Sequence, residues 1–159
     1  MNSNYTIQVS SSKEDKAWDD FLSQTEYGHH VQSSLWAQVK AELGWKARRI
    51  VITNTEKIIA GVQILIRKLS PFVSIGYAPK GPVCSKDHQD AFALLLEQLV
   101  RLSKSERIQL IAVQPPSFYE EMDDDYKGCR FSRSWLELVP TATIHIDLIA
   151  GETEILSQM

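Results

Sequence analysis

The residues of this sequence with the clearest chemical potential are two lysines in unusual settings. Lys80 lies in a PKGP turn, residues 79–82, where two prolines restrict the backbone, so the lysine loses little conformational entropy when it is held in place. Lys40 follows Trp36 by four residues in a helical pattern, and Trp36 is either a core anchor or the wall of a pocket that Lys40 overlooks. Fixed cations suit a phosphate or a carboxylate, although exposed lysines are also common in turns.

The other clusters of reactive side chains in the sequence do not predict a catalytic or metal site. The sequence contains no GxSxG, HExxH, GxxxxGK[ST] or GxGxxG motif. His29 and His30 are adjacent and have no third ligand at a typical spacing, so they predict a solvated loop rather than a metal site. The carboxylates between Glu120 and Asp125 lack the glycine and spacing of a calcium loop and predict a solvated acidic face. His145 is expected on the polar face of a strand.

The composition is that of an ordinary globular domain. The chain has 159 residues, of which 43% are apolar and 23% charged, and its net charge is −3. This charge excludes a nucleic-acid binder that works by phosphate neutralisation alone, while local basic patches remain at residues 46–49 and 67–68. Cys84 and Cys129 predict small buried residues in a reducing compartment. With no signal-peptide pattern and no apolar run long enough for a bilayer, we expect a cytoplasmic protein.

Two helices are predicted before the first expected strand, and the second of them carries Trp36 and Lys40. Ser11 and Glu14 form a capping-box pattern, which predicts a helix over residues 12–25. The second helix spans SSLWAQVKAELG, capped by one of its two serines and ended by its glycine. The apolar residues of this helix are expected to face the core: Leu35, Trp36, Val39 and Leu43.

The rest of the chain predicts alternating strands and helices. Strands are expected at residues 47–54, 57–69, 72–78, 108–113 and 141–148, and helices at residues 86–105 and 117–128. This order describes an α/β (α+β) fold, a mixed sheet with helices on its faces, in a single domain from residue 1 to 159. A last helix begins near Thr153 and is too short to be stable, so the sequence reads as part of a longer chain.

Several blocks of the sequence together resemble a known family. The most specific are Q-S-x-x-W-x-x-x-K, formed by Gln32, Ser33, Trp36 and Lys40, and YAPKGP at residues 77–82; KIIAGVQILIRKL lies between them, and PTATIHIDL comes later. In this order the blocks resemble the N-terminal part of the Fem-type (FemABX) peptidoglycan-bridge aminoacyltransferases, over residues 15–159. The resemblance implies an acetyltransferase-like (GNAT-like) subdomain, the first of two in a longer protein.

The resemblance also implies an activity and a site. Such proteins transfer an amino acid from aminoacyl-tRNA to the stem peptide of a peptidoglycan precursor. In that family the lysine of the first block is associated with holding the precursor; here it is Lys40, with Trp36 beside it. We add Lys80 and Arg67 on electrostatic grounds. Because the aminoacyl ester is already activated, no cofactor and no metal is expected, and no catalytic residue is assigned.

The partners implied by the resemblance are a peptidoglycan precursor and aminoacyl-tRNA. The precursor, a lipid-linked or UDP-linked muropeptide, would bind this chain, and the tRNA would bind the part of such proteins that this sequence lacks. Peripheral contact with a membrane is compatible with a lipid-linked precursor, and the sequence indicates no oligomeric state. The segment LVPTAT, residues 138–143, departs from the Gln-Pro-Arg that relatives commonly carry, which puts any contact of that arginine in doubt.

Two other functions compete with this interpretation. An acyl-CoA-dependent N-acetyltransferase would need a [QR]-x-x-G-x-[GA] loop at a helix N-terminus, and no glycine of the sequence has that spacing. A binding module without activity would hold the precursor through Lys40 and the PKGP turn. In both the transferase and the binding module, replacement of Lys40 by alanine is expected to weaken the binding of UDP-MurNAc-pentapeptide.

Overall fold

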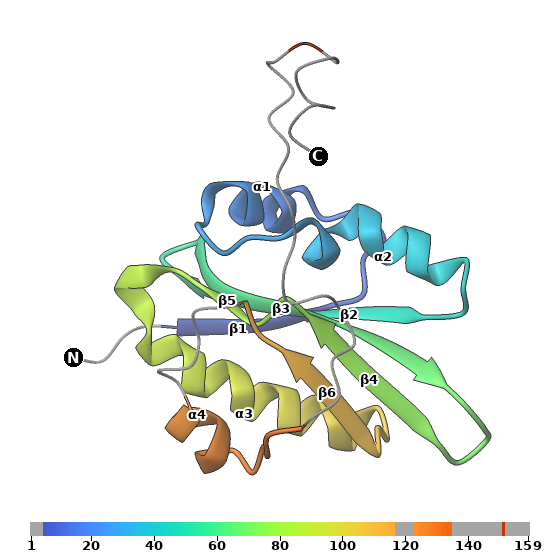
Figure 1. Cartoon of the computed structure of the whole chain (residues 1–159). Helices are drawn as coiled ribbons and strands as arrows, with labels where there is room; N and C mark the ends of the chain where they lie inside the picture. The colour runs from blue at the N-terminus through green and yellow to red at the C-terminus, as the bar shows by residue number, and fades with distance from the viewer. Residues whose placement is uncertain (1–4, 117–122, 135–150, 152–159) are drawn as a thin grey trace.

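The structure is a computed structural model and describes residues 5–116, 123–134 and 151. Its elements, with η for 3-10 helices, are β1 (Tyr5–Ser10), α1 (Lys16–Gln24), η1 (His30–Gln32), α2 (Ser34–Ala41), β2 (Lys46–Asn54), β3 (Lys57–Lys68), β4 (Ser74–Pro79), β5 (Val83–Cys84), η2 (Lys86–His88), α3 (Asp90–Ser105), β6 (Leu110–Gln114) and α4 (Asp123–Gly128). The strands form a central layer, with α1 and α2 on one face and α3 and α4 on the other (Figure 1). The expected mixed sheet flanked by helices is therefore confirmed.

The sheet contains both antiparallel and parallel pairs. Its order is β1-β2-β3-β4-β6, and the short β5 pairs with β3 beside this path. The neighbours β1 to β4 are antiparallel, whereas β4 and β6 are parallel because α3 forms the crossover between them. The hairpin between β2 and β3 turns at Thr55 and Glu56, and both have the positive φ that a tight two-residue hairpin turn requires.

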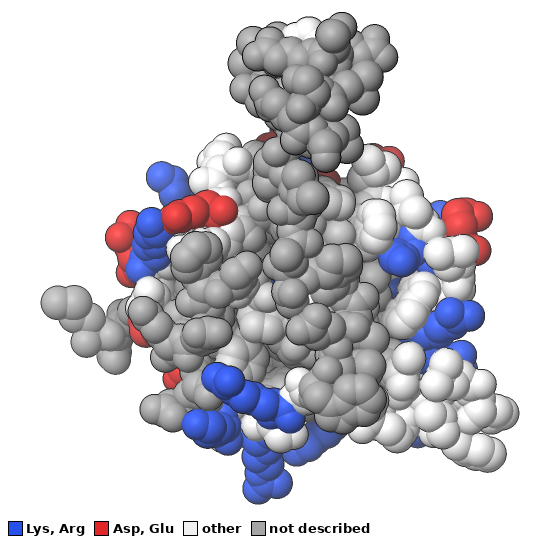
Figure 2. All heavy atoms as spheres, in the orientation of Figure 1, with Lys and Arg blue, Asp and Glu red and all other residues white. Residues whose placement is uncertain are grey.

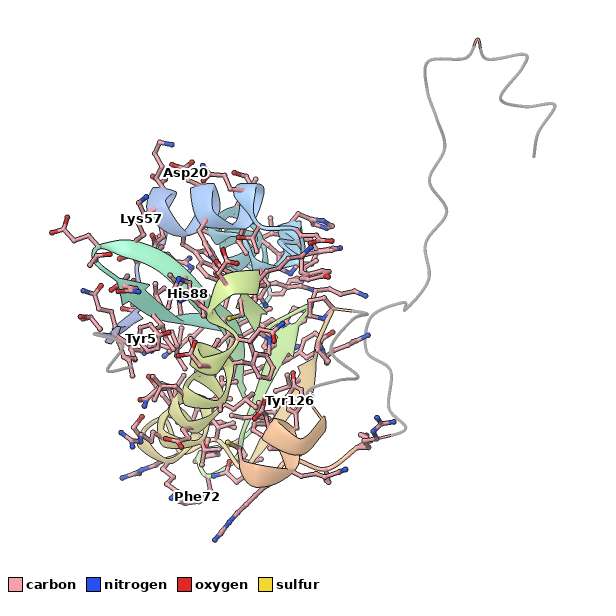
Figure 3. The ribbon with its side chains drawn as sticks, turned by 90° about the vertical axis from the view of Figure 1, so that its left-hand side faces the viewer. Tyr5, Asp20, Lys57, Phe72, His88 and Tyr126 are labelled. Carbon is pink, nitrogen blue, oxygen red and sulfur yellow. The ribbon has the colours of Figure 1, made fainter. Side chains whose placement is uncertain are left out.

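The face of the sheet under α3 is apolar, as the periodicity of the sequence predicts. The helix buries one stripe of side chains: Phe92, Leu95, Leu96, Leu99 and Leu102. These side chains pack on residues of β2 and β3 that alternate along each strand, among them Ile50, Ile52, Val62 and Ile64. Seen from the side, α1 lies above this sheet and α3 below it (Figure 3). The core of the molecule is thus built on this face.

The opposite face of β3 is also buried along most of the strand. Eight consecutive residues of β3, from Ile59 to Ile66, are buried. Trp18 of α1 covers Gly61, where an added Cβ atom would lie 2.4 Å from the Trp18 ring and 2.9 Å from the Ile50 carbonyl oxygen. Gly61 is therefore needed for the close approach of α1 to the sheet.

The expected start of the first helix is wrong. Residues 5–10 form β1, an edge strand that was not predicted, and α1 begins only at Lys16. The cap is Asp15, whose carboxylate accepts a hydrogen bond from the Trp18 backbone nitrogen at 3.2 Å. Asp15 is an equally good capping residue, and β1 fixes where the chain leaves the sheet, so tertiary pairing decides between the two candidate caps.

The expected buried face of α2 is wrong as well. Leu35, Val39 and Leu43 are exposed, by 68%, 49% and 58%. The helix instead turns Ser34 and Ala37 toward the molecule, because their small side chains allow a close approach. The Asp19 carboxylate fixes this orientation by accepting hydrogen bonds from the backbone nitrogen of Ser34 at 2.8 Å and from its hydroxyl.

The two ends of α2 follow the sequence prediction. The Ser33 hydroxyl accepts a hydrogen bond from the Trp36 nitrogen at 3.2 Å, and Gly44 has a φ of +81° just beyond the helix. The short acidic helix also exists and ends at Gly128, as α4. The strand predicted at 141–148, with His145, and the final helix predicted near Thr153 lie outside the described residues. No helix among those described is both long and apolar enough to cross a bilayer.

Candidate functional site

A buried glutamine joins the two sequence blocks that carry the family resemblance. Gln32 is fully buried, and its side-chain nitrogen donates to the carbonyl oxygens of Pro79, at 2.7 Å, and Gln63, at 3.1 Å. Its side-chain oxygen accepts from the Gln63 backbone nitrogen at 2.7 Å. The Trp18 indole donates to the Gln32 carbonyl oxygen at 2.7 Å. One side chain thus fixes the entry to α2 against β3 and against the PKGP corner.

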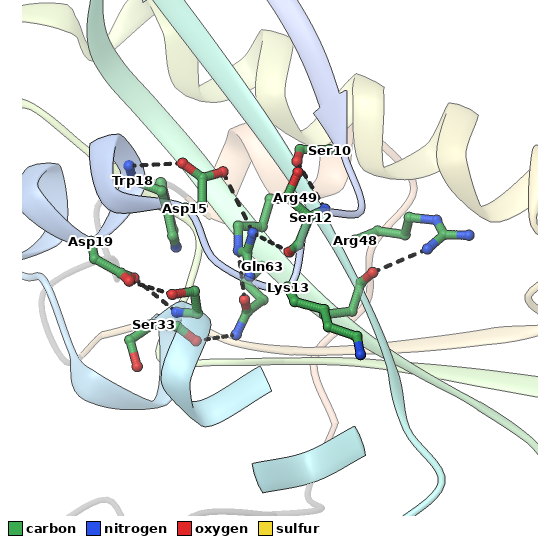
Figure 4. A network of polar contacts seen from close by, with 12 residues as sticks. Ser10, Ser12, Lys13, Asp15, Trp18, Asp19, Ser33, Arg48, Arg49 and Gln63 are labelled. Atoms are coloured by element: carbon green, nitrogen blue, oxygen red, sulfur yellow. Dashed lines mark hydrogen bonds and ion pairs between the residues drawn. The ribbon is translucent and has the colours of Figure 1, made fainter. Parts of the chain in front are cut away.

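A second glutamine extends this junction to the β1–α1 connection (Figure 4). The Gln63 side chain donates to the Ser33 carbonyl oxygen at 2.9 Å and accepts from the Arg49 side-chain nitrogen Nε at 2.8 Å. Arg49 also donates to the Ser12 carbonyl oxygen at 2.8 Å and lies 3.5 Å from the Asp15 carboxylate. Buried polar groups of this kind fix a geometry because an unsatisfied partner is unfavourable.

The burial of Arg49 corrects the basic patch suggested at residues 46–49. Arg49 is only 1% exposed, and one of its guanidinium nitrogens, Nη2, is buried without a hydrogen-bond partner among the described residues. Burial lowers the pKa of Arg49, while the carboxylates of Asp15 and Asp19 oppose the shift. Arg48 pairs with Glu106 at 2.6 Å. Two of the three cations of that segment are therefore engaged within the fold.

The PKGP corner is held by more than its two prolines. Lys80 has a φ of +48°, and the Gly81 nitrogen donates to the Gln114 carbonyl oxygen at 3.3 Å. A Cβ atom on Gly81 would lie 2.8 Å from the side chain of Gln32, so only glycine fits against that amide without displacing it. Lys80 itself stays half-exposed on a corner whose other residues are buried.

Trp36 and Lys40 lie in contact on one flank of α2. The Lys40 Nζ atom is 4.9 Å from the centre of the Trp36 ring, a cation–π geometry. The rings of His30 and Trp36 are nearly perpendicular, with their centres 5.8 Å apart, and the centres of the His29 and His30 rings are 4.4 Å apart. His29 and His30 are therefore part of an ordered row of rings, which their adjacency in the sequence did not predict.

His29 connects this row to Lys80. Burial lowers the pKa of His29, and the positive charges of His30 and Lys80 lower it further. The hydrogen bond from Gln32 of η1 to the Pro79 carbonyl oxygen brings the corner with Lys80 to the end of this row. The Nδ1 atom of His29 accepts a hydrogen bond from the Val31 nitrogen at 3.3 Å, so in the neutral ring Nε2 carries the proton. We call His29, His30, Trp36, Lys40 and Lys80 together the basic–aromatic surface.

Arg67 lies apart from this surface. Its guanidinium carbon is 5.7 Å from the centre of the Trp45 ring, beyond the C-terminal end of α2, and its side chain is exposed. Arg67 follows Gln63 and Leu65 at intervals of two residues along β3, so its side chain lies on the same face of the sheet, the face that carries α2. The structure brings Trp36 and Lys40 into contact and places Lys80 near the same row, but no contact joins Arg67 to Lys40 or Lys80 among the described residues.

The surface offers binding groups rather than an obvious nucleophile. Within the described part of the chain neither Lys40 nor Lys80 forms an ion pair, so both cations can meet an anion. Cys84 is buried, and burial raises the pKa of its thiol to about 12, so the thiolate form is suppressed. Cys129 is also a free thiol. No cluster of metal-binding side chains occurs among the described residues.

A cavity of about 290 Å³ lies on the other flank of α2 and contains none of the predicted site residues. It is lined by the β1–α1 connection, by α2 and by the start of β2, with Lys13, Lys46 and Arg48 at its wall. Of the α2 residues that line it, Gln38 lies on the side of the helix opposite Trp36 and Lys40. This cavity and the basic–aromatic surface are therefore separate.

Comparison with solved structures identifies the fold as that of N-acetyltransferases. An aminoglycoside N-acetyltransferase AAC(6')-Iy, solved in complex with CoA, superposes with a TM-score of 0.60 over 88% of this chain and 95% of its own, at 11% identity. The crystal structure of FemX gives a TM-score of 0.66 at 21% identity and covers 77% of this chain and 31% of FemX. At such identities the likeness defines the fold, and it confirms the expected acetyltransferase-like architecture.

Within that class, the chain belongs to the FemAB family, whose model matches residues 13–136. A lipid II:glycine glycyltransferase of Staphylococcus saprophyticus is 28% identical over 102 residues, which is 64% of this chain and 25% of the relative. The enzyme of the same name from Staphylococcus aureus strain MRSA252 is 28% identical over 98 residues, 61% of this chain and 23% of the relative. The chain spans about a quarter of the length of these relatives.

Proposed function

We propose that this chain forms one acetyltransferase-like unit of a transferase that adds an amino acid to the stem peptide of a peptidoglycan precursor. Family membership and relatives named lipid II:glycine glycyltransferase support this proposal. The amino acid would come from aminoacyl-tRNA, bound by parts of such proteins that this sequence does not cover, in the cytoplasm. The lipid-linked form of the precursor would bring the protein into peripheral contact with the membrane.

The observation that carries the proposal is the arrangement of Lys40, Trp36 and Lys80. Lys40 lies against Trp36, and Lys80 stands on a corner that Gln32 ties to the start of the same helix. A muropeptide precursor combines a diphosphate with a sugar and a peptide that ends in a carboxylate. Two cations beside a flat ring offer charge to the anionic groups and a packing surface to the sugar or peptide. In this proposal Arg67 has a separate role.

The proposed reaction makes few demands on side chains. The primary amine of the stem peptide attacks the carbonyl carbon of the aminoacyl ester, the C–N bond forms, and the C–O bond to the tRNA breaks. The ribose oxygen leaves as a hydroxyl with the proton that the amine gives up. Alignment of the two substrates supplies most of the acceleration, so a binding surface without a nucleophilic serine or cysteine is compatible with catalysis.

The test is a calorimetric titration with UDP-MurNAc-pentapeptide. Lys40→Ala is expected to weaken binding about 10-fold, because a charge-assisted contact is lost. Lys16→Ala is the matched control, since Lys16 is an exposed lysine paired with Asp20 on α1. Equal affinities of the wild type and the Lys40 variant would remove Lys40 from the site.

A binding module without catalytic activity remains the second candidate. The basic–aromatic surface contains binding groups, and the neutral form of His29 carries its proton on Nε2, so it offers no free lone pair there as a base. A single-turnover assay with radiolabelled aminoacyl-tRNA and the precursor separates the two. Binding without transfer of label, in both this chain and a longer form that covers the whole length of its relatives, would favour the binding module.

A further inference from the structure

The hairpin between β3 and β4 ends in an exposed apolar tip. We define the tip as residues 69–73, with the sequence Leu-Ser-Pro-Phe-Val. Phe72 is 87% exposed, Leu69 58% and Val73 40%. Phe72 is at the end of the molecule away from α1 (Figure 3). Exposed apolar residues are common singly, but three within one turn of five residues form a patch that needs an explanation.

The tip is an ordered turn rather than an open loop. The nitrogens of Leu69 and Ser70 donate to the Val73 carbonyl oxygen at 2.8 and 3.2 Å. The Val73 nitrogen donates back to the Ser70 carbonyl oxygen at 3.4 Å, and the Phe72 nitrogen donates to the Ser70 hydroxyl at 3.3 Å. These bonds hold the turn closed, so its apolar side chains are presented outward without a further loss of backbone entropy.

Cations flank the base of this hairpin, and its own strands contribute no carboxylate. Arg67 and Lys68 directly precede the tip and are exposed. Lys46 of β2 is the register partner of Ile66, just before them on β3. The sequence from residue 57 to 86 contains no Asp or Glu. In the space-filling view the end of the hairpin is uncharged, with Lys and Arg side chains between it and α2 (Figure 2). The β3–β4 hairpin therefore carries positive charge next to its apolar tip.

We propose that this tip inserts into the interface of an anionic lipid bilayer, with Phe72 and Leu69 among the acyl chains and Arg67 and Lys68 at the headgroups. A small apolar end with several cations beside it matches a fluid, negatively charged surface, which can close around it. The proposed function supplies only the biological reason for this membrane contact, because a lipid-linked precursor is presented at such a surface. Arg67 also contacts Trp45, which follows α2 in the chain, so the hairpin lies near the end of the helix that carries Lys40.

The experiment measures co-sedimentation of this chain with vesicles of phosphatidylglycerol and phosphatidylcholine, against vesicles of phosphatidylcholine alone. Phe72→Ser is expected to lower the partition coefficient about 10-fold, because the variant has no aromatic ring to transfer from water into the bilayer. The double variant Arg67→Gln and Lys68→Gln is expected to lower it about 25-fold on the anionic vesicles, at about 5-fold per cation. Phe72→Trp should retain binding.

Val9→Ser is the matched control, because Val9 is 55% exposed on β1, at the opposite edge of the sheet. Its partition coefficient should equal that of the wild type. Absence of sedimentation with anionic vesicles, or equal sedimentation of the wild type and Phe72→Ser, would overturn the proposal. A dimer in sedimentation velocity that Phe72→Ser dissociates, with vesicle binding unchanged, would assign the tip to self-association instead.

The outcome is distinguishable from that of the proposed function. UDP-MurNAc-pentapeptide carries no lipid, so its calorimetric titration in the absence of vesicles tests the basic–aromatic surface alone. Phe72→Ser should leave that affinity unchanged, and Lys40→Ala should leave most of the vesicle binding intact. Loss of vesicle binding with normal muropeptide binding would end only the inference about the tip.

Discussion

The two faces of the sheet are held together in different ways. The face under α3 is a contiguous apolar cluster, in which Phe92, Leu95 and Leu99 pack on alternate residues of β2 and β3. The face under α1 and α2 combines a small apolar cluster around Trp18 with the buried side chains of Gln32, Gln63 and Arg49. Apolar contacts are non-directional, whereas each buried hydrogen bond specifies a position.

This difference explains where a binding surface can form. Gln32 bonds directly to the carbonyl oxygen of Pro79, so the corner with Lys80 and the start of α2 are positioned by the same side chain. The α3 face contributes stability, and the polar face contributes the geometry of the loops. Changes on the α3 face should therefore affect stability alone, whereas changes among the buried polar groups should affect binding as well.

The largest expected loss of stability comes from the apolar face. Phe92→Ala should lower the free energy of unfolding by about 4 kcal/mol, because a fully buried ring is replaced by a cavity. Equilibrium urea unfolding measures this change. Where the variant is still folded, its affinity for the muropeptide should match the wild type. A large loss of affinity in the folded variant would contradict the separation of the two faces.

Replacement of the central glutamine should affect both properties. Gln32→Ala leaves the Gln63 nitrogen and the Pro79 oxygen without their partner, which predicts a loss of about 3 kcal/mol and weaker muropeptide binding. Gln38→Ala on α2 is the control, because among the described residues the Gln38 side chain makes one long bond, 3.3 Å, to the Lys13 carbonyl oxygen. If the Gln32 variant lost stability yet bound normally, the junction would not position the corner.

A smaller change isolates the corner itself. Gly81→Ala places a Cβ atom 2.8 Å from the Gln32 side chain and should destabilise the fold by about 1–2 kcal/mol through displacement of that amide. Gly44→Ala offers a comparison, since its left-handed φ causes strain but no atom lies within 4 Å of an added Cβ. Muropeptide affinity should fall for Gly81→Ala and stay unchanged for Gly44→Ala. Equal affinities in calorimetry would show that Lys80 does not depend on this contact.

The smallest expected effect is a pH dependence of stability at His29. Its pKa is lowered in the folded chain, first by burial and then by His30 and Lys80, so the unfolded chain binds a proton more readily near the ordinary pKa of 6.5. The free energy of unfolding should fall as pH decreases from 6.5 toward the lowered value and then level off.

The matched variant is His29→Asn, whose side-chain oxygen can replace Nδ1 as the acceptor for the Val31 nitrogen and which cannot be protonated. Urea midpoints measured across this pH range should decrease less for the variant than for the wild type. The same slope for both proteins would show that His29 does not carry the shift.

Much of the fold could be predicted from the sequence because the apolar residues of several strands and of α3 recur at the spacing of their element. The alternation in β3 and the stripe of α3 led directly to the sheet and to its apolar face. For α2 the same reasoning failed, because small residues and the Asp19 carboxylate, not the large apolar ones, face the molecule. The β1 strand was missed because a short edge strand with exposed residues has a weak pattern.

The candidate site was predictable only in part. Gln32, Trp36 and Lys40 stand out through their place in a shared block, and Lys80 stands out through its prolines. The contacts of His30 with Trp36 and of His29 with His30 depend on the path of η1, which no local pattern encodes. The pairing of Arg49 with Gln63 could have been suspected once the β2–β3 register was known, because the two residues are direct partners on one face.

The most direct test of the central claim is a two-dimensional nitrogen–proton NMR titration of this 159-residue chain with UDP-MurNAc-pentapeptide. The account predicts that the amide signals of residues 29–40 and those of Lys80 and Gly81 shift together along one binding curve, with Lys40→Ala weakening both sets in parallel. Shifts confined to one of these segments, or centred on the cavity beside Lys13 and Lys46, would contradict a shared site at the basic–aromatic surface.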